Sequence, residues 1–300
     1  MIEVICELCE ERLDKYLSER LGVSRSEISK YISEGRVRIN GGEKKPSYRT
    51  KIGDIITYEK PEPICLDILP ENLPIDVIYE DASIIAVNKP KGMIVHPAGK
   101  IVSGTLVNAL LNYTKELSDI NGVIRPGIVH RLDKDTTGIL VIAKNKQSHL
   151  SLLNQLKERS VEKVYYALVF GHFREKTGVI ELPLKRSQSD RKKIAVDLNG
   201  REAITFYRVV RSFKKYSLLR IIIKTGRTHQ IRVHMAHLGH PVVGDYIYHS
   251  GKNEFGIKGQ LLHSYSLAFI NPSEDKYIKF SAPFPEDFSG VISTLKEREK

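Results

Sequence analysis

Residues 127–138 read GIVHRLDKDTTG, and the apolar run ILVIA follows directly at 139–143. A polar loop that leads straight into an apolar strand is typical of sites where a rigid scaffold holds functional side chains. The same residues also suit a well-bonded turn, in which Asp133 and Asp135 accept from backbone amides and Gly138 adopts an unusual backbone conformation. The stretch therefore predicts a buried strand, preceded by either an active loop or a structural turn.

Two chemistries fit the loop. Its histidine and two aspartates could bind a divalent metal ion, or a single carboxylate could act as a nucleophile at a sugar carbon. A second polar segment, GRTHQIRVHMAH at 226–237, places His234 and His237 one helical turn apart. We expect no metal ion there, because the neighbouring arginines carry a fixed positive charge.

The chain around these two segments alternates β-rich runs with few helices. Because many strands adjoin without a helix between them, the pattern favours an α+β fold with a largely antiparallel sheet over repeated β-α-β units. The expected strands are 76–79, 83–88, 139–143, 164–170, 203–210, 218–223 and 261–270. The expected helices are 104–113, 146–159 and 228–238.

An N-terminal stretch predicts a separate small module. Ser24 and Glu27 have the form of a capping box at the start of a second helix, and Asn40-Gly41 suits a tight hairpin turn. Apolar residues at helical spacing predict the two helices: Leu13, Leu17 and Leu21, then Ile28 and Ile32. Prolines at 61, 63, 70 and 74 predict a linker. We therefore expect domains at 1–60 and 75–300, joined by residues 61–74.

Composition limits the class of protein. The 300 residues are 41% hydrophobic and 28% charged, and no apolar stretch reaches the ~18 residues that a membrane span needs. The acidic N-terminal segment does not resemble a signal peptide, so we expect a cytoplasmic protein. Cys6 and Cys9 form an isolated C-x-x-C, which lacks the two further ligands of a structural zinc site.

The net charge of +11 indicates a polyanionic partner. Basic residues are concentrated in two stretches, at 12–60 with twelve Lys and Arg against seven acids, and at 185–215 with ten against three. The candidate phosphate contacts in these stretches are Arg25, Lys30, Arg36, Arg38, Lys44, Lys45, Arg191, Lys192 and Lys193.

The N-terminal module resembles the S4 RNA-binding domain. The matching residues, in order, are Arg12-Leu13-Asp14, Ser24-Arg25-Ser26, Gly35-Arg36-Val37, Asn40-Gly41, Pro46-Ser47 and Gly53-Asp54.

Residues 76–300 resemble the RluA family of RNA pseudouridine synthases, in its RluD-like branch. The resemblance rests on NKPKG at 88–92, HRLD at 130–133, KVYYA at 163–167, GRTHQIRVH at 226–234 and LHS at 262–264. It implies a mixed, mainly antiparallel central sheet and an isomerase that converts uridines of large-subunit (23S) ribosomal RNA to pseudouridine. This reaction breaks the N1–C1′ bond and rejoins the base through C5, so no atoms are gained.

The resemblance also implies roles for four residues. Asp133 would be the catalytic carboxylate, Tyr165 would stack on the uracil, Arg232 would pair with Asp133, and Arg131 would help to hold the flipped-out nucleotide. It implies no metal and no nucleotide cofactor. The oligomeric state stays open, with a monomer as the default expectation. Two alternatives stay open: an inactive S4-type ribosome-assembly factor, and a metal-dependent phosphodiesterase that uses His234 and His237.

Overall fold

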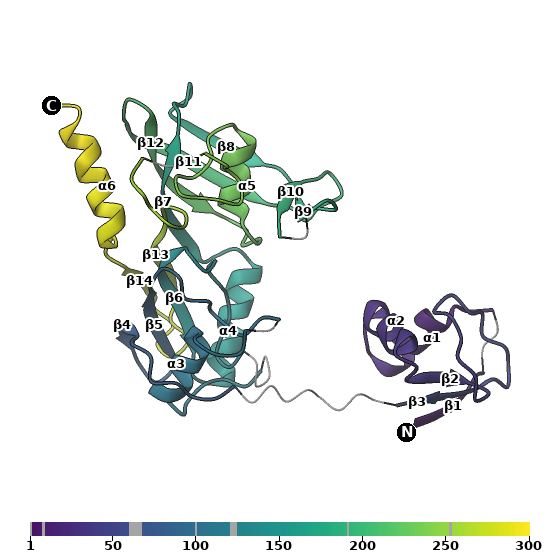
Figure 1. Cartoon of the computed structure of the whole chain (residues 1–300). Helices are drawn as coiled ribbons and strands as arrows, with labels where there is room; N and C mark the ends of the chain where they lie inside the picture. The colour runs from purple at the N-terminus through teal and green to yellow at the C-terminus, as the bar shows by residue number, and fades with distance from the viewer. Residues whose placement is uncertain are drawn as a thin grey trace. The chain divides into compact units, whose positions relative to one another are not determined.

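The computed structural model describes residues 2–7, 10–59, 68–99, 101–120, 125–190, 192–251 and 254–300. The chain forms two compact units, residues 1–65 and 66–300 (Figure 1). Cys9, Arg191 and residues 61–67 of the expected linker lie outside the described residues. The proposed boundaries at 60 and 75 stay a prediction. Within the described ranges, no helix has the length and apolar character needed to cross a membrane.

The smaller unit packs two helices against a three-stranded antiparallel sheet. Its elements are β1 (Ile2–Ile5), α1 (Leu13–Leu21), α2 (Arg25–Ser33), β2 (Val37–Ile39) and β3 (Ile55–Tyr58), with strand order β1-β3-β2. Both helices form where apolar spacing predicted them, and Leu13, Leu17, Ile28 and Ile32 lie in their shared core. Cys6 is buried in the same core.

Two local predictions in the smaller unit are only partly correct. Asn40 and Gly41 have φ values of +52° and +77° and form a tight turn, but β2 pairs with β3, which begins only at Ile55. The Asn40 side chain accepts from the Ile55 amide at 2.9 Å, so the turn fixes the start of β3 instead of joining two paired strands.

The predicted capping box is also only half formed. The Ser24 hydroxyl accepts from the Glu27 amide at 3.4 Å, as expected. The Glu27 carboxylate instead accepts from the Tyr31 hydroxyl at 2.6 Å. The Tyr31 hydroxyl, one helical turn further along, thus takes the Glu27 carboxylate, which in a complete capping box would accept from the Ser24 amide.

The larger unit is built on a nine-stranded mixed sheet, which confirms the α+β expectation. Its strands are β4 (Asp76–Glu80), β5 (Ile84–Lys89), β6 (Thr137–Ala143), β7 (Glu162–Phe170), β8 (Thr177–Glu181), β11 (Ile204–Ser212), β12 (Tyr216–Ile223), β13 (Leu262–Ile270) and β14 (Tyr277–Ser281). The order is β4-β5-β6-β13-β7-β12-β11-β8, with β14 paired to β13. Every pairing is antiparallel except β6 with β13, which is parallel.

Four helices and a separate hairpin complete the larger unit. The helices are α3 (Leu106–Tyr113), α4 (Lys146–Lys157), α5 (Gln230–His237) and α6 (Glu286–Glu297), and the hairpin consists of β9 (Leu184–Arg186) and β10 (Ile194–Val196). Figure 1 shows α3 and α4 beside β4–β6, and α5 beside β8 and β11. The helices α3, α4 and α5 were predicted. The amphipathic α6, which buries Phe288, Val291 and Leu295, was not.

Strand β6 is buried on both faces. Leu140 and Ile142 lie in the core cluster that contains α3, whereas Ile139 and Val141 lie in the cluster that contains Leu152 of α4. Burial on both faces explains why this strand is an unbroken apolar run and not an alternating one. It also holds the preceding polar loop at a fixed place in the sheet.

Residues 68–74, which we expected to belong to the linker, are bound to the larger unit. Asn108 donates to the Leu69 carbonyl at 2.9 Å, and the Glu71 carboxylate accepts from the Gly104 amide at 3.0 Å. The prolines at 70 and 74 therefore stiffen a segment that packs beside α3.

Gly138 makes a close backbone approach that a side chain would prevent. Its φ is +107°, and a Cβ atom would lie 2.2 Å from the Ser264 carbonyl oxygen of β13. We expect Gly138→Ala to lower the free energy of unfolding by about 2–5 kcal/mol, measured by urea denaturation, because strain and a clash add. Gly290→Ala in α6 is the control: it meets open space and should be stabilising by about 0.5–1 kcal/mol. Equal stability of both variants would contradict this account.

Candidate active site

One cavity of about 660 Å³ in the larger unit is lined by residues of both polar segments. It brings together Arg131, Asp133, Tyr165 and Arg232, the four residues to which the sequence analysis assigned roles. These residues come from the loop before β6, from β7 and from α5.

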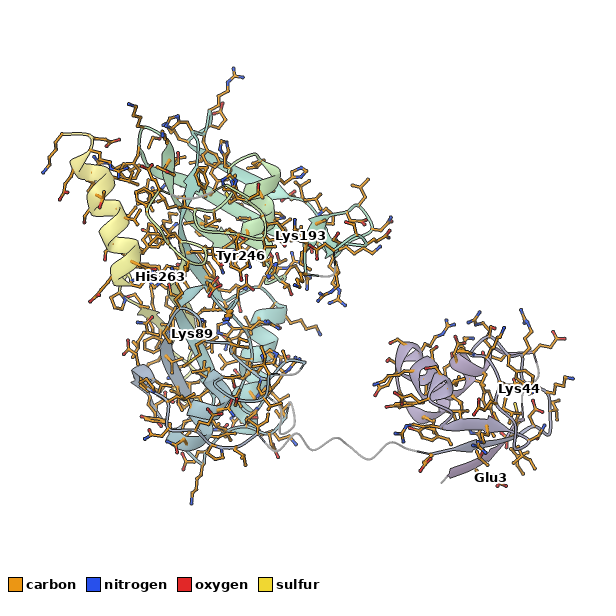
Figure 2. The ribbon with its side chains drawn as sticks, viewed as in Figure 1. Glu3, Lys44, Lys89, Lys193, Tyr246 and His263 are labelled. Atoms are coloured by element: carbon orange, nitrogen blue, oxygen red, sulfur yellow. The ribbon has the colours of Figure 1, made fainter. Side chains whose placement is uncertain are left out.

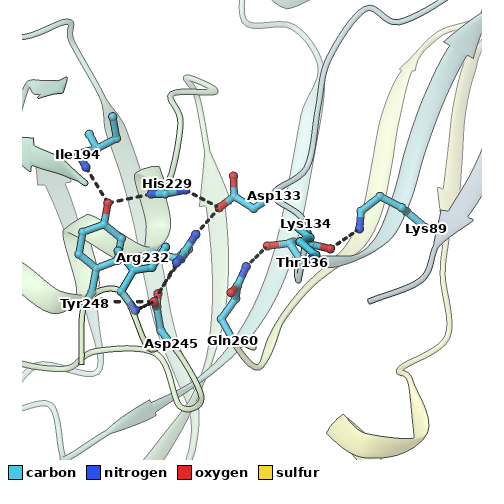
Figure 3. Close-up of polar contacts among 11 residues, drawn as sticks. Lys89, Asp133, Lys134, Thr136, Ile194, His229, Arg232, Asp245, Tyr248 and Gln260 are labelled. Carbon is cyan, nitrogen blue, oxygen red and sulfur yellow. Dashed lines mark hydrogen bonds and ion pairs between the residues drawn. The ribbon is translucent and has the colours of Figure 1, made fainter. Parts of the chain in front are cut away.

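The loop that carries Asp133 is fixed from two sides. Its backbone forms a turn in which the Thr136 amide donates to the Asp133 carbonyl at 3.1 Å. The buried Lys89 ammonium donates to the Lys134 carbonyl at 3.0 Å, and Gln260 donates to the Thr136 hydroxyl at 3.0 Å (Figure 3). The turn that the sequence suggested therefore exists, and it presents the aspartate to the cavity.

Lys89 is a site residue for which sequence reasoning gave no role. Its three donors are directed at three carbonyl oxygens, those of Pro90, Met93 and Lys134, at 2.8–3.0 Å. Burial lowers the pKa of Lys89 to about 7, against the opposite effect of Asp135 and Asp133. The sequence signals were its place at the end of an apolar strand and within the NKPKG motif at 88–92, neither of which specified this role.

Arg232 connects two carboxylates. Its guanidinium forms two bonds with Asp245, Nε to Oδ2 at 2.6 Å and Nη2 to Oδ1 at 2.8 Å, and Nη1 donates to Asp133 Oδ2 at 3.0 Å. Arg232 is only 3% exposed. Although burial opposes it, pairing with Asp245 and then with Asp133 keeps the pKa of Arg232 above its usual value. The predicted Asp133–Arg232 pair is present, and Asp245 is a partner that the sequence analysis missed.

Tyr165 presents an aromatic ring to the cavity. It lies on β7 opposite Ile221 of β12 and Ser264 of β13, and it is 6% exposed. Burial raises the pKa of Tyr165 to about 12, with a smaller opposite effect from a hydrogen bond with Ser264. The phenol is therefore neutral at neutral pH.

The cavity wall is positively charged. Among the described residues that line it, one side chain is a carboxylate, that of Asp133. Five are basic: Arg125, Arg131, Lys163, Arg227 and Arg232. Burial, and then Lys224 and Arg227, lower the pKa of Lys163 to about 8. Such a wall attracts phosphate groups.

The histidines of the two motifs do not form a metal site. His130 Nε2 accepts from the Val141 amide at 3.0 Å, and both ring nitrogens of His234 are bonded within the fold, to Thr205 and to the Leu182 carbonyl. His237 is exposed. In the part of the chain that the structure describes, no three His, Cys, Asp or Glu side chains gather as metal ligands.

The predicted phosphate contacts differ in their surroundings. Arg25 pairs with Asp14 at 3.3 Å, whereas Lys30 and Arg36 both contact Glu34. No ion pair within the described ranges occupies Arg38, Lys44, Lys45, Lys192 or Lys193, and all five are exposed. Figure 2 labels Lys44 on the smaller unit and Lys193 near the β9–β10 hairpin of the larger one.

Comparison with solved structures identifies the fold. A human protein named RNA pseudouridylate synthase domain containing 1 aligns with a TM-score of 0.58 at 23% identity, over 78% of this chain and 97% of that one. The larger unit therefore has the fold of a pseudouridine synthase.

Sequence comparison then identifies the family. Residues 83–237 match the model of the RNA pseudouridylate synthase family, and residues 11–56 match the S4 domain. An RNA pseudouridine synthase of Bacillus subtilis is 43% identical over 288 residues, covering 96% of this chain and 95% of that protein. The ribosomal large subunit pseudouridine synthase D of Zymomonas mobilis is 39% identical over 297 residues, covering 95% and 93%. The chain belongs to the RNA pseudouridylate synthase family and is a pseudouridine synthase with an N-terminal S4 domain.

His96, which lines the cavity, should make stability depend on pH. It is 3% exposed, its Nδ1 has no hydrogen-bond partner, and burial, followed by Arg125 and Arg131, lowers its pKa to about 4. Because the unfolded chain binds this proton first, folding loses stability as the pH falls from about 6.5 towards 4.

Between pH 7 and pH 5, the free energy of unfolding should fall by about 1–2 kcal/mol less in His96→Gln than in the wild type, as measured by urea denaturation at each pH. His237→Gln, which changes an exposed ring, is the control and should keep the wild-type slope. A His96→Gln protein with an unaltered slope would show that His96 does not carry this effect.

Proposed function

We propose that this enzyme isomerises uridines of large-subunit ribosomal RNA and that Asp133 is its catalytic carboxylate. The observation that carries the proposal is the Asp133 carboxylate, paired with Arg232 at 3.0 Å, inside a basic cavity that also holds Tyr165. The large-subunit target is supported by the relative from Zymomonas mobilis, whose name states that substrate.

The reaction needs a carboxylate beside the nucleotide and an open position around it. Asp133 is 17% exposed on its side chain, so it is reachable from the cavity while Arg232 holds one of its oxygens. A carboxylate in this place can act as a nucleophile or as a base for a sugar proton. The isomerisation leaves the composition of the nucleotide unchanged, because the C5 hydrogen that is lost to water is balanced by a hydrogen gained on N1. Asp133 must therefore regain its starting state at the end of each turnover.

The cavity suits an extruded nucleotide. A target base inside an RNA stack is out of reach of any side chain, so it must leave the stack. Stacking on Tyr165 would recover about 1–3 kcal/mol of that cost. Arg131, which is exposed at the cavity wall, would help to hold the flipped-out nucleotide.

The smaller unit would bind RNA through its free cations. Arg38, Lys44 and Lys45 are exposed, and the Lys44 ammonium lies 5.5 Å from the centroid of the Tyr48 ring. On the larger unit, Lys192 and Lys193 are exposed beside β10. These cations have more to gain from a phosphate than Arg25, Lys30 and Arg36, because those three already contact carboxylates.

The direct test is Asp133→Asn. We expect this variant to release no tritium from ribosomal RNA labelled at uridine C5, because the amide is neither a nucleophile nor a base. RNA binding should persist, since the cationic surfaces are unchanged. Asp76→Asn, on the edge strand β4 and outside the cavity, should release tritium at the wild-type rate.

The outcomes separate the proposal from its alternative. Wild-type release by Asp133→Asn would refute the role of Asp133. Tight RNA binding without tritium release by the wild-type protein would instead support an inactive assembly factor.

RNA affinity gives an independent test of the smaller unit. We expect Lys44→Ala combined with Lys45→Ala to weaken binding and to reduce the slope of log K against log salt by about 1–2, because two phosphate contacts are lost. Lys15→Ala on α1 is the control, because its ammonium is already paired with Glu11 at 2.6 Å. Equal slopes for the wild type and the double variant would rule out this surface.

A further inference from the structure

A chain of contacts leads from the β9–β10 hairpin to the carboxylate of Asp133. The Ile194 amide donates to the Tyr248 hydroxyl at 2.9 Å, and that hydroxyl lies 2.8 Å from His229 Nδ1. His229 Nε2 lies 3.9 Å from Asp133 Oδ2 (Figure 3). Nothing in the resemblance assigned a role to Tyr248 or His229.

The Tyr248 hydroxyl determines which nitrogen of His229 carries a hydrogen. Burial raises the pKa of Tyr248 to about 12, so its hydroxyl keeps its hydrogen. One lone pair of the oxygen is used by the Ile194 amide, and the acceptor available to the hydroxyl among the described residues is His229 Nδ1. If His229 Nδ1 donated instead, the hydroxyl of the half-buried Tyr248 would lose this acceptor within the fold, which is unfavourable.

His229 therefore holds its own hydrogen on Nε2. Burial lowers the pKa of His229, outweighing the opposite effect of Asp133, so the ring is neutral with a single N–H. With Nδ1 accepting from Tyr248, that N–H lies on the side of the ring that faces Asp133 Oδ2.

The backbone of His229 is held in an unusual conformation. Its φ is +55°, in the left-handed region that residues other than glycine rarely adopt, and it is the N-cap of α5. The next residue, Gln230, fixes this corner through bonds from its amide to the Ile204 carbonyl and the Thr205 hydroxyl, both 3.0 Å. Such strain persists where surrounding contacts enforce it, and it is frequent at functional sites.

Two nitrogen atoms lie nearest the same oxygen of the carboxylate. Arg232 Nη1 donates to Oδ2 at 3.0 Å, whereas His229 Nε2 lies 3.9 Å from Oδ2, just beyond hydrogen-bond distance. No hydrogen bond from the described residues reaches Oδ1 of Asp133. We infer that His229, oriented by Tyr248, is a positioning residue that holds Asp133 so that Oδ1 is the oxygen that reacts with the nucleotide. This inference rests on the proposed role of Asp133.

Three variants test the inference through turnover. His229→Asn suits the left-handed backbone but is too short to reach Asp133, so we expect kcat to fall about 10- to 100-fold with KM unchanged. His229→Gln can place an amide N–H near the position of Nε2 and should recover most of kcat. Tyr248→Phe removes the hydroxyl that orients the ring and should lower kcat without changing KM. Thermal unfolding of each variant checks that it is folded.

Nuclear magnetic resonance tests the same inference without activity. Long-range proton–nitrogen spectra of protein labelled in histidine, with His229 assigned by its loss in His229→Asn, should show the hydrogen on Nε2. The Tyr248→Phe variant should show a mixture of both tautomers. A hydrogen on Nδ1 in the wild type, wild-type kcat in His229→Asn, or equal losses in His229→Asn and His229→Gln would overturn the inference. Since the tautomer is read without RNA, its failure is distinct from failure of Asp133 as the catalytic group.

Discussion

The site depends on the ion pairs that the Arg232 guanidinium forms with two carboxylates. The guanidinium joins helix α5 to Asp245 through two hydrogen bonds and to the loop before β6 through Asp133. A charge that is 97% buried is stable only if partners compensate it, and here two carboxylates do so. Asp245 binds the Nε–Nη2 edge of the guanidinium, which leaves Nη1 to donate to Asp133. The position of the carboxylate thus follows from the pairing of Arg232 with Asp245, which is not among the residues that line the cavity.

The central sheet brings the loop that carries Asp133 close to Tyr165. Strand β6 is buried on both faces and runs parallel to β13, with Gly138 opposite Ser264. The close backbone approach at Gly138 sets where the Asp133 loop ends. Tyr165 on β7 faces the same cavity, because β13 pairs with β6 on one side and with β7 on the other. The Asp133 loop and the Tyr165 ring therefore come from parts of the chain that are distant in sequence and close in the sheet, and helix α5 adds Arg232.

Apolar patterning predicted much of this fold, but it could not predict which side chains distant in sequence contact one another. Seven strands and three helices of the larger unit are found where apolar runs and apolar spacing placed them, because their buried residues are continuous or recur regularly along the chain. The strands β9 and β10 are too short to show alternation, and Gly290, Ser289 and Ser293 weaken the helical signal of α6. The Asp133–Arg232 pair was expected from the resemblance. Asp245, Tyr248 and His229 were missed as partners because their roles arise from contacts across the fold, which no local pattern records.

The account's central claim is that Arg232, anchored by Asp245, makes Asp133 effective. It is tested most directly by a double-mutant cycle of single-turnover pseudouridine formation, using Asp245→Asn, Arg232→Gln and the combined variant. If Asp245 acts only through Arg232, the combined variant should be no slower than Arg232→Gln alone, because residues that act as a unit are not additive. Losses of rate that multiply in the combined variant would show that the two residues act independently and would contradict the account.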